Sequence, residues 1–106
     1  MQKISIIGCG WLGLPLAKKL LSKNYIVSGS TTSKDKLNDL KKNNIDAYIL
    51  NFPNNINTLK TLCETDILIL TLPFKRSYTP PEIYYKQLKT ILNYAENKQV
   101  KKILLT

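Results

Sequence analysis

Residues 4–13 read ISIIGCGWLG, so an apolar run leads directly into the pattern Gly8-x-Gly10-x-x-Gly13. This pattern is typical of the turn between a first β-strand and a first helix. In such a turn the first glycine allows a tight bend, the second lets a phosphate oxygen approach the backbone, and the third lets the helix pack closely on the strand. The free N–H groups and the positive dipole end of the helix favour an anion. We therefore predict that residues 8–13 bind a pyrophosphate.

Apolar strand patterns and amphipathic helix patterns alternate along the whole chain. Strands are predicted over residues 3–7, 25–30, 46–50, 66–72 and 100–105. Helices are predicted over 12–22 and 34–43 and from Pro80-Pro81-Glu82 to about 97, with a short helix or turn over 56–63. This alternation predicts an α/β Rossmann-type doubly wound parallel sheet, with strand order 3-2-1-4-5 and helices on both faces. No linker or repeat divides residues 1–106, so we expect a single domain.

The predicted strand order reverses between the first and fourth strands, and a ligand crevice is expected at their carboxyl ends. The glycine turn lies on one side of this crevice, and it includes Trp11 and Leu12. The other side is the end of the fourth strand, at Thr71, Leu72 and Pro73. Trp11 could cover the pyrophosphate or pack against the end of the fourth strand, and the sequence leaves both interpretations open.

The stretch SGSTTSK, residues 28–34, spans the end of the second predicted strand. This region discriminates between NAD and NADP in such domains. An NAD site usually has an Asp or Glu about 20 residues after the glycines, which binds the ribose 2′-hydroxyl. No acid occurs in this chain before Asp35. Hydroxyl groups and an ammonium group suit a 2′-phosphate, which a carboxylate would repel. We therefore predict NADP in preference to NAD, with contacts from Ser30, Thr31, Thr32 and Lys34. The alternative is that Thr32 and Ser33 only cap the next helix and that Lys34 is solvated.

The chain has a formal net charge of +9. Its basic residues are scattered and almost all are lysine, which indicates a compositional bias rather than a nucleic-acid interface. The charge should still favour anionic ligands by long-range attraction. No apolar run approaches the roughly 18 residues of a membrane span. Because Met1 leads directly into the first predicted strand without a leader pattern, we expect a cytoplasmic protein. From the scattered lysines and the short apolar runs, we expect it to bind neither nucleic acid nor membrane.

Catalytic and metal-binding patterns are weak in this sequence. The chain has no histidine, and Cys9 and Cys63 are isolated, so neither a metal site nor a disulfide is predicted. Two Tyr-x-x-x-Lys patterns, at 85–89 and 94–98, match the acid/base pair of short-chain dehydrogenases. A chain with 6 Tyr and so many Lys produces such matches by chance. Both also precede the last predicted strand, whereas a functional pair would follow it. We therefore predict no catalytic residue in this chain.

Four stretches together resemble a known family: IIGCGWLGLPLAKKLL, VSGSTTSKDKL, DILILTLPFKRS and KKILLT. They are similar to the N-terminal half of bacterial NAD(P)-binding proteins of the extended short-chain dehydrogenase type, described as NAD-dependent epimerase/dehydratase-like. The resemblance implies that the cofactor is bound by Gly8–Gly13, the 30–34 region and the 71–73 edge. In that family the catalytic Tyr and Lys lie beyond the fifth strand. The resemblance therefore implies that a part acting on a sugar nucleotide or another small substrate lies outside residues 1–106.

Two other classes of protein remain open. The cofactor domain of a β-hydroxyacid dehydrogenase, such as a 6-phosphogluconate dehydrogenase-like enzyme, shares the glycine pattern and a strand of the form D-x6-P, as found over residues 66–73. A non-enzymatic nucleotide-sensing Rossmann module is the third class. Such modules often keep an acid after the second strand, and its absence here counts against them.

Overall fold

The computed structural model describes residues 2–8, 13–50, 56–71 and 81–105. Its strands are β1 (Lys3–Ile7), β2 (Ile26–Thr31), β3 (Asp46–Ile49), β4 (Ile67–Leu70) and β5 (Lys102–Leu105). They pair in parallel in the order β3-β2-β1-β4-β5, which confirms the predicted sheet. β2 lies one residue later than predicted, and β5 begins two residues later because residues 98–101 form a turn and bend instead.

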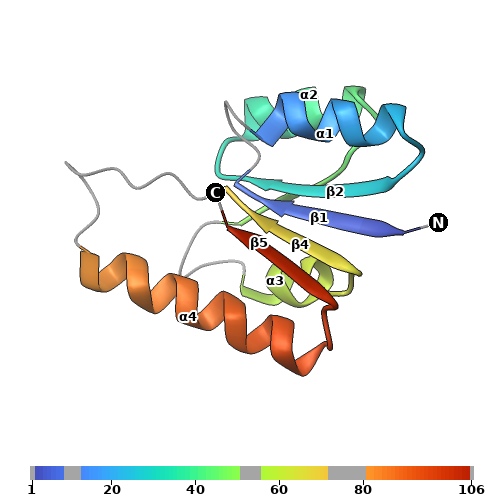
Figure 1. Ribbon diagram of the computed structural model, residues 1–106. Helices are drawn as coiled ribbons and strands as arrows, with labels where there is room; N and C mark the ends of the chain where they lie inside the picture. Colours follow the sequence, from blue (N-terminus) through green and yellow to red (C-terminus); the bar gives the residue numbers. More distant parts are fainter. Residues whose placement is uncertain (1, 9–12, 51–55, 72–80, 106) are drawn as a thin grey trace.

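Helices cover both faces of the sheet, as predicted (Figure 1). α1 (Gly13–Ser22) and α2 (Lys34–Lys42) lie on one face, and α3 (Ile56–Leu62) and α4 (Pro81–Asn97) lie on the other. The segment that the sequence left as a short helix or turn is therefore a helix. All five strands run toward the same edge, which we call the carboxyl edge; the opposite edge is the amino edge.

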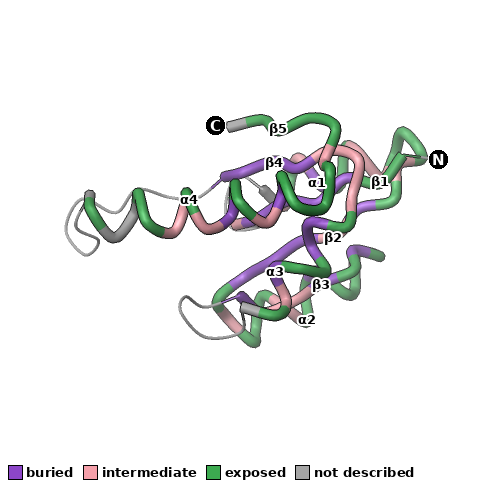
Figure 2. Tube along the Cα trace, turned by 90° about the horizontal axis from the view of Figure 1, so that it is seen from below, coloured by how far each residue is buried: buried purple, intermediate pink, exposed green. Residues whose placement is uncertain are grey.

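Strand alternation divides the apolar side chains into two cores. Successive side chains of a strand point to opposite faces of the sheet. In β4, Ile69 packs under α1 and α2, whereas Leu68 and Leu70 pack against α3 and α4. Figure 2 shows the buried residues concentrated along the central strands, with β5 exposed at the border of the sheet. The sheet reverses its order between the buried strands β1 and β4.

α1, α2 and α4 end at the amino edge in the same type of turn. Each is followed by a residue with positive φ: Asn24 at 68°, Asn44 at 63° and Gln99 at 58°. In α4, the Val100 N–H donates to the carbonyl of Ala95 at 3.1 Å, and the Gln99 N–H donates to that of Glu96 at 3.1 Å. This pair of bonds is the Schellman motif, which satisfies the last helical carbonyls. The same pair recurs after α1 and α2.

Candidate functional site

Gly8 lies directly after β1, at the carboxyl edge, and its backbone requires glycine. Its φ of +93° is in the region that side chains rarely adopt. A Cβ on this residue would lie 3.0 Å from the carbonyl oxygen of Thr71 and 3.1 Å from its carbonyl carbon. The nearest atoms are backbone and cannot rotate away. Both the backbone conformation and the close packing therefore require glycine at the first position of the pattern.

Two hydroxyl groups hold Gly8, one from each neighbouring strand. The Gly8 N–H donates to Oγ of Ser30 in β2 at 3.0 Å. The hydroxyl of Thr71, the residue after β4, donates to the Gly8 carbonyl oxygen. We call Ser30, Gly8 and Thr71 the hydroxyl clasp. It joins the ends of three adjacent strands at the point where the strand order reverses.

Both hydroxyl residues of the clasp are buried. Ser30 is 2% exposed and Thr71 is 9% exposed. The sequence places these two residues among the cofactor contacts, and the structure adds bonds to the turn that sequence reasoning missed. A signal was available, because the pairing of Ile7 with Leu70, extended by one residue, sets Thr71 beside Gly8. That signal becomes visible only once the strand order and register are known.

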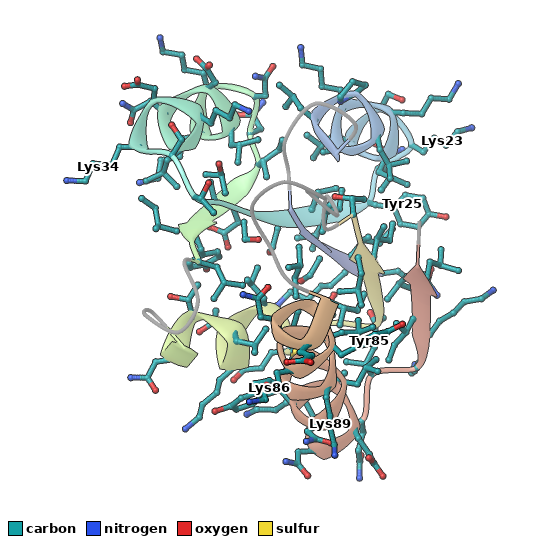
Figure 3. The ribbon with its side chains drawn as sticks, turned by 90° about the vertical axis from the view of Figure 1, so that its left-hand side faces the viewer. Lys23, Tyr25, Lys34, Tyr85, Lys86 and Lys89 are labelled. Carbon is teal, nitrogen blue, oxygen red and sulfur yellow. The ribbon has the colours of Figure 1, made fainter. Side chains whose placement is uncertain are left out.

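The end of β2 contains further hydroxyls that bind backbone. Oγ1 of Thr31 accepts the Ser33 N–H at 3.3 Å. Oγ of Ser33 accepts the Lys36 N–H at 3.5 Å and forms the N-cap of α2. Ser33 thus takes the capping role that the sequence left open. Thr32 and Lys34, in contrast, are exposed, and the Lys34 side chain extends outward from the start of α2 (Figure 3).

The start of α1 suits an anion. α1 begins at Gly13, the third glycine of the pattern, and its first turn contains no acidic residue. Its N-terminal N–H groups and dipole therefore favour negative charge without a competing carboxylate in that turn. Gly10, Trp11, Leu12, Leu72 and Pro73, also predicted to contact the cofactor, lie outside the described residues. Both interpretations of Trp11 therefore stay predictions.

The remaining candidates for chemistry lie away from this site. Cys63 directly follows α3 and is fully buried in the core between the sheet and α4, and burial raises the pKa of its thiol to about 11. The thiol is therefore neutral near pH 7 and a poor nucleophile. Tyr85 and Lys89 are exposed on α4, which precedes β5 (Figure 3), and their exclusion as a catalytic pair stays a prediction. Among the described residues, no group of His, Cys, Asp and Glu could hold a metal ion, and no helix is long and apolar enough to cross a membrane.

A shallow hollow of about 440 Å³ lies at the amino edge, on the side opposite the glycine turn. It lies where α1 and α2 return to the sheet, and residues of its lining include Leu21, Tyr25, Ile26 and Ile45. Because it lies at the amino ends of β2 and β3, it is distinct from the predicted crevice at the carboxyl edge.

The parallel sheet with a glycine turn at its switch point defines a Rossmann-type nucleotide-binding domain. Residues 3–100 match the family described as the NAD binding domain of 6-phosphogluconate dehydrogenase, and the chain belongs to that family. It is an NAD(P)-binding domain. Of the classes that the sequence left open, this match corresponds to the β-hydroxyacid type.

One curated relative matches the chain in sequence, and two solved structures match it in fold. The chain is 32% identical to Protein YeeZ of Escherichia coli K12 over all of its own length, and it spans 40% of that protein. A putative epimerase from Bacteroides thetaiotaomicron is 17% identical with a TM-score of 0.76, over 98% of this chain and 46% of that one. An anaerobillin reductase from Escherichia coli O157:H7 is 14% identical with a TM-score of 0.75, over 97% of this chain and 49% of that one. At these identities the two solved structures support the fold alone.

Proposed function

We propose that this domain binds NADP(H) in preference to NAD(H), with the pyrophosphate at the 8–13 turn. Membership of an NAD-binding family supports a dinucleotide as the ligand. The observation that carries the choice of NADP is the end of β2, which continues as Thr32, Ser33 and Lys34 where an NAD site usually has Asp or Glu. The pyrophosphate contacts of this proposal are Gly8, Gly10, Trp11, Leu12 and Gly13, and Thr71, Leu72 and Pro73 form the opposite side of the crevice.

The 2′-phosphate contacts follow from exposure at the end of β2. Ser33 caps α2, and the oxygen of Thr31 accepts a backbone N–H. Thr32 and Lys34 are exposed and can meet a phosphate with a hydroxyl and an ammonium group. Asp35 is the next residue, and as an acid in the first turn it stabilises the start of α2.

Titration with NADPH and NADH tests the cofactor choice. We expect NADPH to bind at least about tenfold more tightly, since a charge-assisted contact contributes about 1.5–3 kcal/mol. Lys34→Ala should lower the affinity for NADPH by about tenfold and leave that for NADH unchanged. The matched control is Lys42→Ala, at the opposite end of α2, which should change neither affinity. Tighter binding of NADH would contradict the choice of NADP, and binding of neither would contradict the proposal as a whole.

The groups that act on a substrate are proposed to lie outside residues 1–106. Two observations support this. The chain spans 40% of YeeZ, and Tyr85 and Lys89 lie on α4, which precedes β5. The family match favours the cofactor domain of a β-hydroxyacid-type oxidoreductase over an epimerase/dehydratase-like protein. A long helical segment after residue 106 would support the first class, and a Tyr-x-x-x-Lys pattern after a Ser/Thr-rich segment would support the second. We expect residues 1–106 alone to bind NADPH without oxidising it in the presence of small carbonyl substrates or sugar nucleotides.

A further inference from the structure

We propose that Ser30 and Thr71 are positioning residues that fix the glycine turn through Gly8, without contacting the cofactor themselves. The proposal rests on the proposed binding of a dinucleotide at residues 8–13. It assigns the two hydroxyls a different role from the direct contacts that their positions in the sequence suggest.

The two bonds of the clasp hold different peptide planes. The Gly8 N–H belongs to the plane that joins residues 7 and 8, and the Gly8 carbonyl belongs to the plane that joins residues 8 and 9. Ser30 binds the first group and Thr71 binds the second. The relative orientation of these planes is the φ and ψ of Gly8. Holding both planes therefore sets the direction in which the chain leaves β1 and enters the turn.

Glycine makes such a restraint necessary. It populates positive and negative φ about equally, so a free Gly8 would sample several directions of exit from β1. A turn that binds a pyrophosphate with its backbone must present its N–H groups in one arrangement before the ligand arrives, because ordering them afterwards lowers the affinity. The clasp supplies that order from β2 and β4, the two strands that flank β1.

Burial separates both hydroxyls from the ligand, and for Thr71 the bonding of its proton does so as well. Ser30 and Thr71 are nearly inaccessible to solvent, at 2% and 9% exposed. Oγ1 of Thr71 also lies 3.3 Å from the carbonyl oxygen of Ile7, so its proton is directed at the backbone carbonyls of Ile7 and Gly8. Thr32 and Lys34 lie near Ser30 in the sequence but are exposed, and these residues can reach a phosphate.

The decisive experiment compares Ser30→Ala, Thr71→Val and Thr71→Ser by titration with NADPH and NADH. We expect Ser30→Ala and Thr71→Val to weaken both cofactors by the same factor, about tenfold, because the pyrophosphate is common to the two. Thr71→Ser, which keeps the hydroxyl, should restore affinity to within about twofold of the unmodified chain. The matched control is Thr90→Val in α4, which removes a similar hydroxyl bond, to the Lys86 carbonyl at 2.9 Å, far from the turn.

Three results would overturn the proposal. Loss confined to NADPH in Ser30→Ala would mean that Ser30 holds the 2′-phosphate directly. If Thr71→Ser binds the cofactors as weakly as Thr71→Val does, the loss of the hydroxyl is not the cause of the lower affinity. If Ser30→Ala and Thr71→Val both bind the cofactors as tightly as Thr90→Val does, the clasp does not position the turn. If Thr71→Val does not fold, Ser30→Ala decides the question from the other side of Gly8.

Amide hydrogen exchange separates this proposal from the proposed function. The Gly8 N–H should exchange faster by about tenfold or more in Ser30→Ala than in the unmodified chain, without any cofactor present, because its acceptor is removed. Faster exchange together with no cofactor binding by the unmodified chain would contradict the proposed function. Normal cofactor binding together with unchanged exchange would contradict the clasp.

Discussion

The two edges of the sheet join the ends of neighbouring strands with different chemistry. At the amino edge the Thr65 hydroxyl donates to the Lys3 carbonyl oxygen at 2.8 Å, and the neighbouring Asp66 adds a charged group. The Asp66 carboxylate accepts the Lys3 N–H at 3.0 Å and lies 3.9 Å from the Lys101 ammonium group. The backbone carbonyl oxygen of Asp66 also accepts the N–H groups of Lys101 and Lys102. At the carboxyl edge the same task falls to the neutral hydroxyls of Ser30 and Thr71, which are buried.

The difference fits the proposed binding of a pyrophosphate at the carboxyl edge. A carboxylate binds backbone N–H groups more strongly than a hydroxyl does, so it is the better joining group where no ligand enters. At an edge that binds a pyrophosphate, a carboxylate would repel the ligand. Neutral hydroxyls satisfy the backbone there without adding negative charge. The comparison predicts that changes at the carboxyl edge lower cofactor affinity, whereas changes at the amino edge affect stability alone.

The largest effect is expected from Gly8→Ala. A Cβ there meets the backbone of Thr71 and forces a strained φ, so we expect a loss of about 1–3 kcal/mol in the free energy of unfolding. Cofactor affinity should fall by about 100-fold, because the turn can no longer leave β1 in the same direction. Urea unfolding and titration with NADPH measure the two effects. The double variant with Thr71→Ala should not recover, since the nearest atom belongs to the backbone; recovery would contradict the packing argument.

Asp66→Asn should lower stability without changing cofactor affinity. The amide keeps an oxygen for the Lys3 N–H but loses the charge, and Asp66 is partly exposed, so we expect a loss of about 1 kcal/mol. Urea unfolding at low and high salt measures this, and added salt should reduce the difference between variant and parent. Glu96→Gln, exposed on α4, is the control and should change little. A drop in NADPH affinity for Asp66→Asn would break the distinction between the edges.

The smallest effect is expected from Gln99→Gly, in the turn that links α4 to β5. Gln99 has a φ of 58°, and glycine adopts this conformation without a steric cost. We expect a gain of about 0.5–1 kcal/mol in stability, measured by thermal unfolding, and no change in affinity. Asn24→Gly should gain less, because Asn tolerates positive φ better than Gln does. A loss of stability in Gln99→Gly would mean that its side chain contributes more than its strained backbone costs.

Local pattern predicted most of the fold and part of the site. The strands and helices follow from the spacing of apolar residues, and the parallel sheet with its switch point follows from their alternation. The need for glycine at position 8 also follows from the motif. The roles of Ser30 and Ser33 were less accessible: both are small hydroxyl residues near the end of one strand, yet Ser30 binds Gly8 and Ser33 caps α2.

The sequence by itself determined the order of the elements, the parallel sheet and the place of the glycine turn, because these depend on residue type and spacing along the chain. Only the tertiary structure decided that Ser30 and Thr71 meet at Gly8. These residues are 22 and 63 positions from Gly8, and hydrogen bonds over such separations exist only when strand order and register bring the ends of β2, β1 and β4 together. The glycine pattern marks where the anion is expected, and the packing of three strands sets the conformation of Gly8, the residue with which that turn begins.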